Sequence, residues 1–274
     1  MSVGTIGVIT NDRRHVFQRD LIIGIEKCAE QHQFMVEIDS LAENPDSPQP
    51  ISLDVPALDG VIVITNVLDD AELTALHNLG TPISLISHWS NQLPIPAVIQ
   101  NNLDGINRLV DYMVEGCGRR NLVFIRGDMS QHDGRSRDKV FQECIYRHNL
   151  TIPESHWLRG DFIPRIAAES IKGLIESGAE FDGVIASDFL MARAVLNVLK
   201  DHKIRIPEDV CVVGFGDGPE AEAVGLTTVA ADIIELGQRA TRQLIAQING
   251  ASMQGVTWLN TSIIERDTCC QMVG

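Results

Sequence analysis

The chain has 274 residues, of which 44% are apolar, enough for one large or two medium-sized folded domains. Its formal net charge of −15 repels polyanions, so the composition excludes a nucleic-acid-binding surface, which needs a basic patch. No stretch reaches the roughly 18 apolar residues of a membrane span, and the N-terminus shows no secretory signal, so we expect a cytoplasmic protein without membrane contact.

The first hundred residues alternate short β-rich runs with segments of helical periodicity. Apolar residues recur at helical spacing from Phe17 to Ala29, and the segment 69–80 begins with acidic residues and ends at a glycine, as helices do. Strands are predicted over 5–10, 34–38, 59–65, 82–87 and 97–101. The polar segment 40–54 is predicted to be a loop inside this half of the chain.

The same rhythm restarts in the second half. Helices are predicted over about 103–115, around Phe141, and over 167–178 and 190–204, with strands over 121–127, 156–162, 181–187 and 209–215. The segment 128–137 is predicted to be a loop that leads into the helix around Phe141. Two successive sets of βα units indicate an α/β protein with two doubly wound parallel-sheet lobes.

Polar residues recur directly after the predicted strands in both halves. They are Asn11, Asp12, Thr65, Asn66, Ser87, His88 and Asn101, followed in the second half by Arg135, Arg137, Ser187, Asp188 and Asp217, with the aromatic Phe162. In open α/β sheets, ligands bind beyond the carboxyl ends of the strands. If the strand ends of two lobes face each other, they line a cleft suited to a neutral molecule rich in hydroxyl or amide groups. Taken singly, each residue could be an ordinary loop residue, and it is the repetition that favours a site.

We find no familiar enzyme motif in the sequence. It contains no nucleophile elbow, no H-E-x-x-H and no P-loop, so we expect neither an enzyme nor a cofactor. The turn GFGDGP begins like a dinucleotide-binding loop but places Pro219 where the last glycine belongs. Asp217 in this turn either contacts a ligand or caps its own turn through a side-chain hydrogen bond.

The six cysteines are scattered and include no C-x-x-C pair, so the sequence predicts no metal site. Reduced structural thiols are expected for a cytoplasmic protein, with the Cys269–Cys270 pair exposed near the C-terminus.

Residues 181–229 resemble the effector-binding core of the lactose/galactose-repressor (LacI/GalR) family of bacterial transcription regulators. The matching elements are a strand ending in Asn or Asp and followed by xMA, the segment xxPEDVxVVGF, an acidic residue after that strand, and LTTV. Shorter similarities extend from GVIT near the start to IIERDT near the end. The resemblance implies a two-lobed fold of the periplasmic-binding-protein-like type I, which the chain crosses three times. The lobes would comprise 1–101 with 232–254, and 102–231 with 255–274.

The resemblance also implies ligand-binding positions. Phe17 and Gln18 would face the cleft from the first helix, and Asn101 takes the place of the usual Asp at the first crossing. Arg137 matches the Arg of an R-x-x-G-F motif, although Val140 replaces its glycine. Many family members read GFD, whereas Gly216 here shifts the acid by one residue. The predicted ligand-binding set is Asn11, Phe17, Gln18, Thr65, His88, Asn101, Arg137, Phe162, Asp188 and Asp217.

The function implied is the effector-binding and dimerisation domain of a LacI-type regulator. Its effector would be a sugar, polyol or nucleobase-like molecule, whose binding moves the lobes and so controls DNA binding. The chain would form a homodimer and reach operator DNA only through a helix-turn-helix headpiece that is absent from this chain. The alternatives are the sensory input domain of a signalling enzyme such as a diguanylate cyclase, or a periplasmic sugar-binding protein. A sugar-processing enzyme would need a nucleophile or a spaced carboxylate pair that we do not find.

Overall fold

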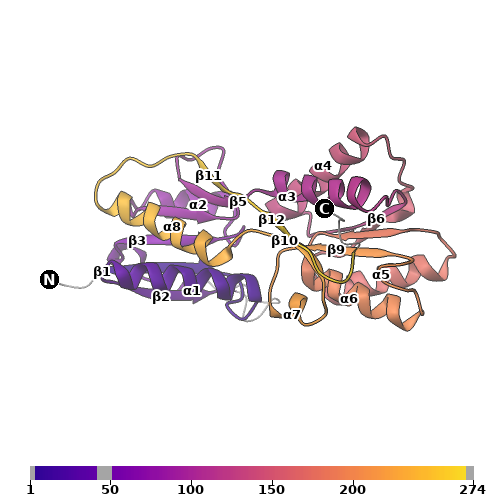
Figure 1. Cartoon of the computed structure of the whole chain (residues 1–274). Coiled ribbons are helices and arrows are strands. Elements are labelled where there is room, and N and C mark those ends of the chain that lie inside the picture. Colours follow the sequence, from indigo (N-terminus) through magenta and orange to yellow (C-terminus); the bar gives the residue numbers. More distant parts are fainter. Residues whose placement is uncertain (1–3, 42–50, 270–274) are drawn as a thin grey trace. The chain divides into compact units, whose positions relative to one another are not determined.

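The computed structural model describes residues 4–41 and 51–269, which form two α/β units (Figure 1). Unit 1 comprises Met1–Gln100 and Asp232–Leu259, and unit 2 comprises Asn101–Ala231 and Asn260–Gly274. The chain therefore passes from one unit to the other three times. Each unit contains a six-stranded, mostly parallel sheet, which confirms the predicted fold class.

Unit 1 is built on a sheet with the strand order β11-β5-β4-β3-β1-β2, in which every pair is parallel. Its strands are β1 (Gly4–Thr10), β2 (Phe34–Ser40), β3 (Gly60–Ile64), β4 (Ile83–Ile86), β5 (Ala97–Gln100) and β11 (Val256–Leu259). Its helices are α1 (Val16–Gln31), the short η1 (Val55–Ala57), α2 (Asp70–His77) and α8 (Ile233–Ile248). Every residue of the central strands β3 and β4 is buried, as expected when helices cover both faces of a parallel sheet.

Helices α1 and α8 pack against each other at close range (Figure 1). A Cβ atom added at Gly24 of α1 would lie 2.1 Å from the carbonyl oxygen of Ile234, and one at Gly237 of α8 would lie 2.3 Å from that of Leu21. These glycines allow the two backbones to meet, which holds α8 beside α1 although more than 200 residues separate them. The contact between α1 and α8 therefore joins the two chain segments that make up unit 1, Met1–Gln100 and Asp232–Leu259.

Unit 2 has the strand order β12-β10-β9-β8-β6-β7, parallel except for the β10–β12 pair. Its strands are β6 (Leu122–Arg126), β7 (Trp157–Arg159), β8 (Gly183–Ala186), β9 (Cys211–Phe215), β10 (Thr227–Ala230) and β12 (Ser262–Ile264). Its helices are α3 (Asn102–Asp111), η2 (Tyr112–Gly116), α4 (His132–Arg147), η3 (Glu154–His156), α5 (Pro164–Glu176), α6 (Phe189–Asp201) and α7 (Pro219–Glu222). Stacked rings of Phe124 and Phe141, 4.2 Å apart, anchor α4 to β6 in the core.

Three predicted boundaries differ from the structure. The predicted loop 128–137 is helical from His132, so Arg135 and Arg137 lie on α4 rather than before it. The predicted strand 156–162 ends at Arg159, because Asp161 and Phe162 adopt left-handed backbone angles, with φ of 54° and 58°. The third crossing was predicted before residue 255, but β11 pairs with β5, which keeps it in unit 1.

The cysteine prediction holds in part. Cys28, Cys144, Cys211 and Cys269 are buried thiols that form no disulfide, whereas Cys117 is disulfide-bonded. Cys269 was predicted to be exposed, and this was wrong because the segment after β12 packs onto the core of unit 2. Cys270 and residues 42–50 of the predicted loop 40–54 lie outside the described residues. Over those described, we find no helix with the length and apolar character to cross a membrane.

Candidate functional site

The two sheets share one topology, which marks equivalent positions in both units. In unit 1, β1 lies between β2 and β3, and in unit 2, β6 lies between β7 and β8. The strand order therefore reverses between β1 and β3 and between β6 and β8. In open α/β sheets the crevice beyond the carboxyl ends of the strands at such a point is the usual place for a ligand.

Buried polar groups collect at these carboxyl edges. Thr10 ends β1, Ser87 follows β4 and Ser187 follows β8, and the side-chain oxygen of each is buried without a hydrogen-bond partner among residues 4–41 and 51–269. We call these three the orphan hydroxyls. The side-chain carbonyl of Gln18 on α1 is buried in the same way. Leaving such a group unsatisfied costs about 1–3 kcal/mol, so these groups are candidates for ligand contacts.

Unit 1 places five predicted residues at the same edge. Asn11, Phe17 and Gln18 follow the end of β1, while Thr65 and His88 follow β3 and β4, and these three strands are neighbours in the sheet. Thr65 adopts a left-handed φ of 58° and its hydroxyl donates to the Ile64 carbonyl at 2.7 Å. His88 is buried, with Nδ1 3.2 Å from the Ile86 carbonyl oxygen. Left-handed backbone at a non-glycine residue is strained and concentrates at functional sites.

Arg137 lies at the point of reversal in unit 2, where its guanidinium is almost fully engaged. Its Nη1 donates to the carbonyl of Ser187 at 2.6 Å and its Nε donates to Oδ1 of Asn102 at 2.9 Å. Its Nη2 is 3.3 Å from the carboxylate of Asp133, and the ring of Phe215 lies 3.8 Å below the guanidinium. Burial lowers the pKa of Arg137, opposed by Asp133 and Asp188, and an arginine remains charged under these conditions. Asp133 therefore balances the charge of Arg137, and the hydrogen bonds hold its guanidinium in one position.

Phe162 stands beside this network. Its ring centroid is 5.8 Å from the Arg137 guanidinium, and a Cβ atom at Gly127 would lie 2.3 Å from the ring. Gly127, directly after β6, therefore gives the ring its place at the strand end. That the ring forms an aromatic wall for a ligand stays a prediction.

Two further predicted residues cap helices. Asn101 accepts a hydrogen bond from the backbone of Asp104 at 3.1 Å at the start of α3. Asp188 accepts from the backbone of Leu190 and Met191 at 2.8 and 3.0 Å at the start of α6. Both side chains thus stabilise the helices that begin at the edge, whatever else they contact.

Asp217 occupies a turn opened by Gly216, whose φ of 84° suits glycine. Both of its carboxylate oxygens accept from Arg266, at 2.8 Å each, and Oδ1 also accepts from the Thr228 hydroxyl at 2.9 Å. The hydrogen bonding of Arg266 to this carboxylate is the main reason why the pKa of Arg266 is raised. In the described contacts the side chain therefore binds Arg266 instead of capping its own turn.

Sequence reasoning missed three members of these edges. Asn102 and Asp133 join Arg137 in one network, in which the Asn102 amide donates to Asp133 at 2.7 Å. Asn102 follows Asn101 in the sequence, and the doubled amide at a crossing was the available signal. Thr10 was assigned to a strand and not considered as a ligand contact.

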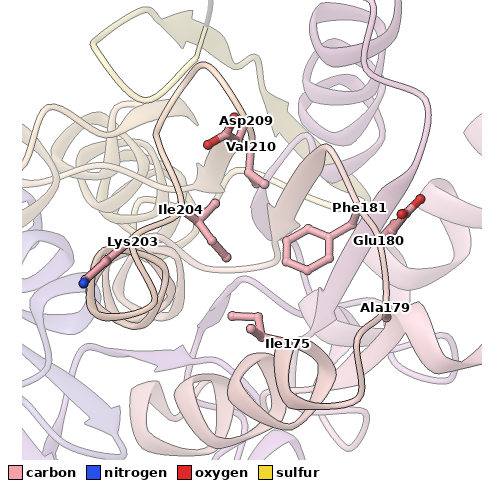
Figure 2. Close-up of a pocket in the computed structure, with 8 residues that line it drawn as sticks. All are labelled: Ile175, Ala179, Glu180, Phe181, Lys203, Ile204, Asp209 and Val210. Atoms are coloured by element: carbon pink, nitrogen blue, oxygen red, sulfur yellow. The ribbon is translucent and has the colours of Figure 1, made fainter.

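A cavity of about 440 Å³ lies at the opposite edge of the second sheet (Figure 2). Its walls come from the segments that enter β8 and β9, and the side chains of Ile175, Phe181 and Ile204 point toward one another in it. None of the ten predicted ligand-binding residues lines it. The cavity is therefore separate from the polar carboxyl edge.

Comparisons with known proteins bear on the whole chain. The model of the periplasmic binding protein-like domain matches residues 110–269. Catabolite control protein A of Priestia megaterium is 22% identical over 254 residues, which cover 89% of this chain and 75% of that protein. The transcriptional repressor CytR of Escherichia coli K12 is 26% identical over 251 residues, 90% of this chain and 73% of CytR. A crystal structure of the lac repressor dimer bound to operator and the anti-inducer ONPF superposes with a TM-score of 0.84 and 20% identity, covering 99% of this chain and 95% of that one.

Proposed function

The chain belongs to the family of periplasmic binding protein-like domains, as the ligand-binding domain of a LacI/GalR-type regulator, and on this premise we propose that it binds a small, neutral, hydroxyl-rich effector. The effector would contact the carboxyl edges that carry the predicted residues, from Asn11 to Asp217. Its class would be a sugar, a polyol or a nucleoside-like molecule.

The observation that carries this proposal is the set of orphan hydroxyls. Thr10, Ser87 and Ser187 all lie at the carboxyl ends of parallel strands, the first two in unit 1 and the third in unit 2. A hydroxyl is both a donor and an acceptor, and so is each hydroxyl of a polyol. A ligand of that kind satisfies the orphan hydroxyls without bringing a charge into a buried place, and charges are costly there.

The paired charges at the edge of unit 2 support a neutral effector. The cation of Arg137 is balanced by Asp133, and that of Arg266 by Asp217. A phosphate or carboxylate ligand would have to displace a carboxylate from a well-formed pair, and breaking a buried pair is strongly unfavourable. A neutral ligand can use the Phe162 ring and remaining lone pairs and leave both ion pairs intact.

The relatives favour a regulatory role over the alternatives. CytR is named a transcriptional repressor, and the lac repressor structure contains a dimer on its operator. We infer that this chain likewise dimerises, acts in the cytoplasm and, through a DNA-binding headpiece outside this chain, controls transcription. The effector would act by its difference in affinity for two arrangements of the protein, since equal affinity shifts no equilibrium.

Thermal shift of the purified chain against a panel of neutral hexoses, pentoses, polyols and nucleosides, together with their phosphorylated counterparts, tests the proposal. We expect at least one neutral compound to raise Tm in a concentration-dependent way, because a ligand that binds only the folded state stabilises it. The same compound should act less on Ser187→Ala, while Ser177→Ala, at the end of α5, serves as the control. Shifts caused only by phosphorylated compounds would overturn the assignment of a neutral effector.

A further inference from the structure

Three cysteines that are far apart in the sequence meet in the core of unit 2. The Sγ atoms of Cys117, Cys211 and Cys269 all lie within 4.8 Å of one another, and those of Cys117 and Cys269 are 3.3 Å apart. The thioether sulfur of Met113 is 3.4 Å from Cys269 Sγ. We call these four residues the sulfur cluster. Cys211 is the first residue of β9, so the cluster lies at the amino edge of the sheet, opposite to the carboxyl edge that carries Ser187.

The backbone holds the sulfur cluster in place. Cys117 ends the π-helical turn η2, where its amide donates to the Tyr112 carbonyl at 3.0 Å. Next to Cys269, the Thr268 hydroxyl donates to the Val212 carbonyl at 2.7 Å, and the Val212 amide donates to the Thr268 carbonyl at 2.8 Å. Single π-helical turns are rare and frequent at functional sites. These contacts pre-organise three sulfur ligands from three segments.

The surroundings fit a thiophilic cation. Cys211 and Cys269 are buried, whereas Cys117 is partly exposed and gives access from solvent. Arg119 donates at 2.6 Å to the carbonyl of Pro207, which Cys211 Sγ also contacts at 3.8 Å. The guanidinium and Cys211 Sγ thus share one carbonyl oxygen, and cysteine sulfur binds metals as the thiolate. The carboxylate of Glu265 accepts a hydrogen bond from the Tyr112 hydroxyl at 3.2 Å.

We propose that, when Cys117 is reduced, the sulfur cluster binds one Cu(I) ion through the three cysteine thiolates, with the Met113 thioether as a further ligand. Thiolate and thioether ligands select Cu(I) among biological metals, and the thioether makes the set less suited to zinc. Each thiol that binds the metal releases its proton to solvent. Since Cys117 is disulfide-bonded in this structure, a dithiol reductant must first cleave that bond, giving two protein thiols and an oxidised reductant.

The test is an anaerobic titration of the full, reduced chain with Cu(I) in competition with a chromogenic Cu(I) chelator. We expect one Cu(I) per chain. The Cu(I) affinity should be lower by about 100-fold in Cys211→Ala and in Cys269→Ser, because each variant lacks one of the three thiolate ligands. Cys28→Ala and Cys144→Ala are matched controls, since both thiols are buried elsewhere and burial raises the pKa of Cys144 to about 11. Both should bind like the parent chain.

Oxidation of the thiols provides a second test of the site. The chain treated with a thiol oxidant should lose the site and regain it after reduction, which separates a thiolate site from binding by surface histidines. Circular dichroism before titration verifies that the variants are folded. Unchanged Cu(I) affinity in folded Cys211→Ala and Cys269→Ser, or equal losses in the Cys28 and Cys144 controls, would overturn the proposal.

Discussion

The hydroxyls of Thr10 and Ser87 make no hydrogen bond among the described residues that would stabilise the fold. Each is buried at the carboxyl end of a strand, and neither hydroxyl is paired within the described ranges 4–41 and 51–269. Replacing an unsatisfied buried group by an apolar one is close to neutral or stabilising, by up to about 1 kcal/mol. We therefore expect Thr10→Val and Ser87→Ala to keep or raise the urea midpoint while weakening effector binding at least about 10-fold.

Ser84 provides the matched control for this prediction. It lies on β4, three residues before Ser87, and its hydroxyl is also buried and unpaired over the part of the chain that the structure describes. It is inside the strand instead of at its end. Ser84→Ala should share the small effect on stability and leave binding unchanged, whereas equal losses of affinity at Ser84 and Ser87 would contradict a site at the carboxyl edge.

Asp217 holds Arg266 through two hydrogen bonds, and both side chains are mostly buried. Asp217→Ala should lower the free energy of unfolding by about 1–3 kcal/mol, because it leaves a partly buried cation unpaired. The exposed pair Arg165–Glu169 is the control, and Glu169→Ala should change stability by less than about 0.5 kcal/mol. If Asp217→Ala abolishes effector binding at an unchanged urea midpoint, Asp217 acts on the ligand and not on Arg266.

Asp104 makes the stability of unit 2 depend on pH. Burial tends to raise its pKa, but hydrogen bonds from Arg108 and Thr261 outweigh burial and hold the pKa below the usual 3.8. A depressed carboxyl pKa stabilises the folded state above the unfolded pKa, and this contribution is lost as pH falls through the folded pKa. The Tm difference between the parent chain and Asp104→Asn should be present at pH 7 and shrink below pH 4; a difference that persists at pH 2 would rule out this linkage.

The crossing of α1 and α8 leaves no room for added volume at its two glycines. A Cβ atom at Gly24 or Gly237 would collide with backbone carbonyls of the facing helix, which cannot rotate away. Gly24→Ala and Gly237→Ala should each destabilise the chain by more than about 2 kcal/mol, measured by urea unfolding.

Gly173, inside α5, is the matched control for both. A Cβ atom there would meet no described atom within 4 Å, so Gly173→Ala should stabilise by about 0.5–1 kcal/mol through helix propensity alone. Destabilisation of similar size at all three glycines would show that the effect does not come from the α1–α8 contact.

The helices and strands also show how much of the fold could be predicted from the sequence. Strands β1, β3, β8 and β9 were predicted within a few residues, because buried parallel strands read as runs of Val and Ile. The start of α4 was misjudged because Gly134 stands among polar residues and suggests a turn. It is helical, and glycine is needed there because a Cβ atom would lie 2.0 Å from the Asp128 carbonyl oxygen. This close approach depends on how the backbone folds back between Asp128 and Gly134, and residue types alone do not reveal it.

The site residues divide in the same way. Polar residues that follow strands could be recognised because the strands themselves could be predicted. This placed Asn11, Thr65, Ser187 and their neighbours at the carboxyl edges of the sheets. Pairings over long separations were invisible. Asp217 meets Arg266 across 49 residues, and Cys117 meets Cys269 across 152. Neither pair leaves a spacing pattern in a single sequence.

At the scale of the whole molecule, dimerisation is the prediction that the relatives suggest. Analytical ultracentrifugation of the purified chain should give the mass of a dimer, about twice the 30.1 kDa of one chain, at micromolar concentration. A single species of one chain mass at about 100 μM would contradict dimerisation by this domain alone.

Calorimetric titration of the chain with matched pairs of neutral and phosphorylated ligands shows whether the carboxyl edges bind a neutral, hydroxyl-rich effector. We expect one neutral ligand per chain with a Kd of about 10 μM or tighter, and binding of its phosphorylated counterpart at least about 10-fold weaker. Thr10→Val and Ser187→Ala should both weaken binding of the neutral ligand. Tighter binding of the phosphorylated counterpart would rule out a neutral effector, and full affinity in both variants would rule out a site at the orphan hydroxyls.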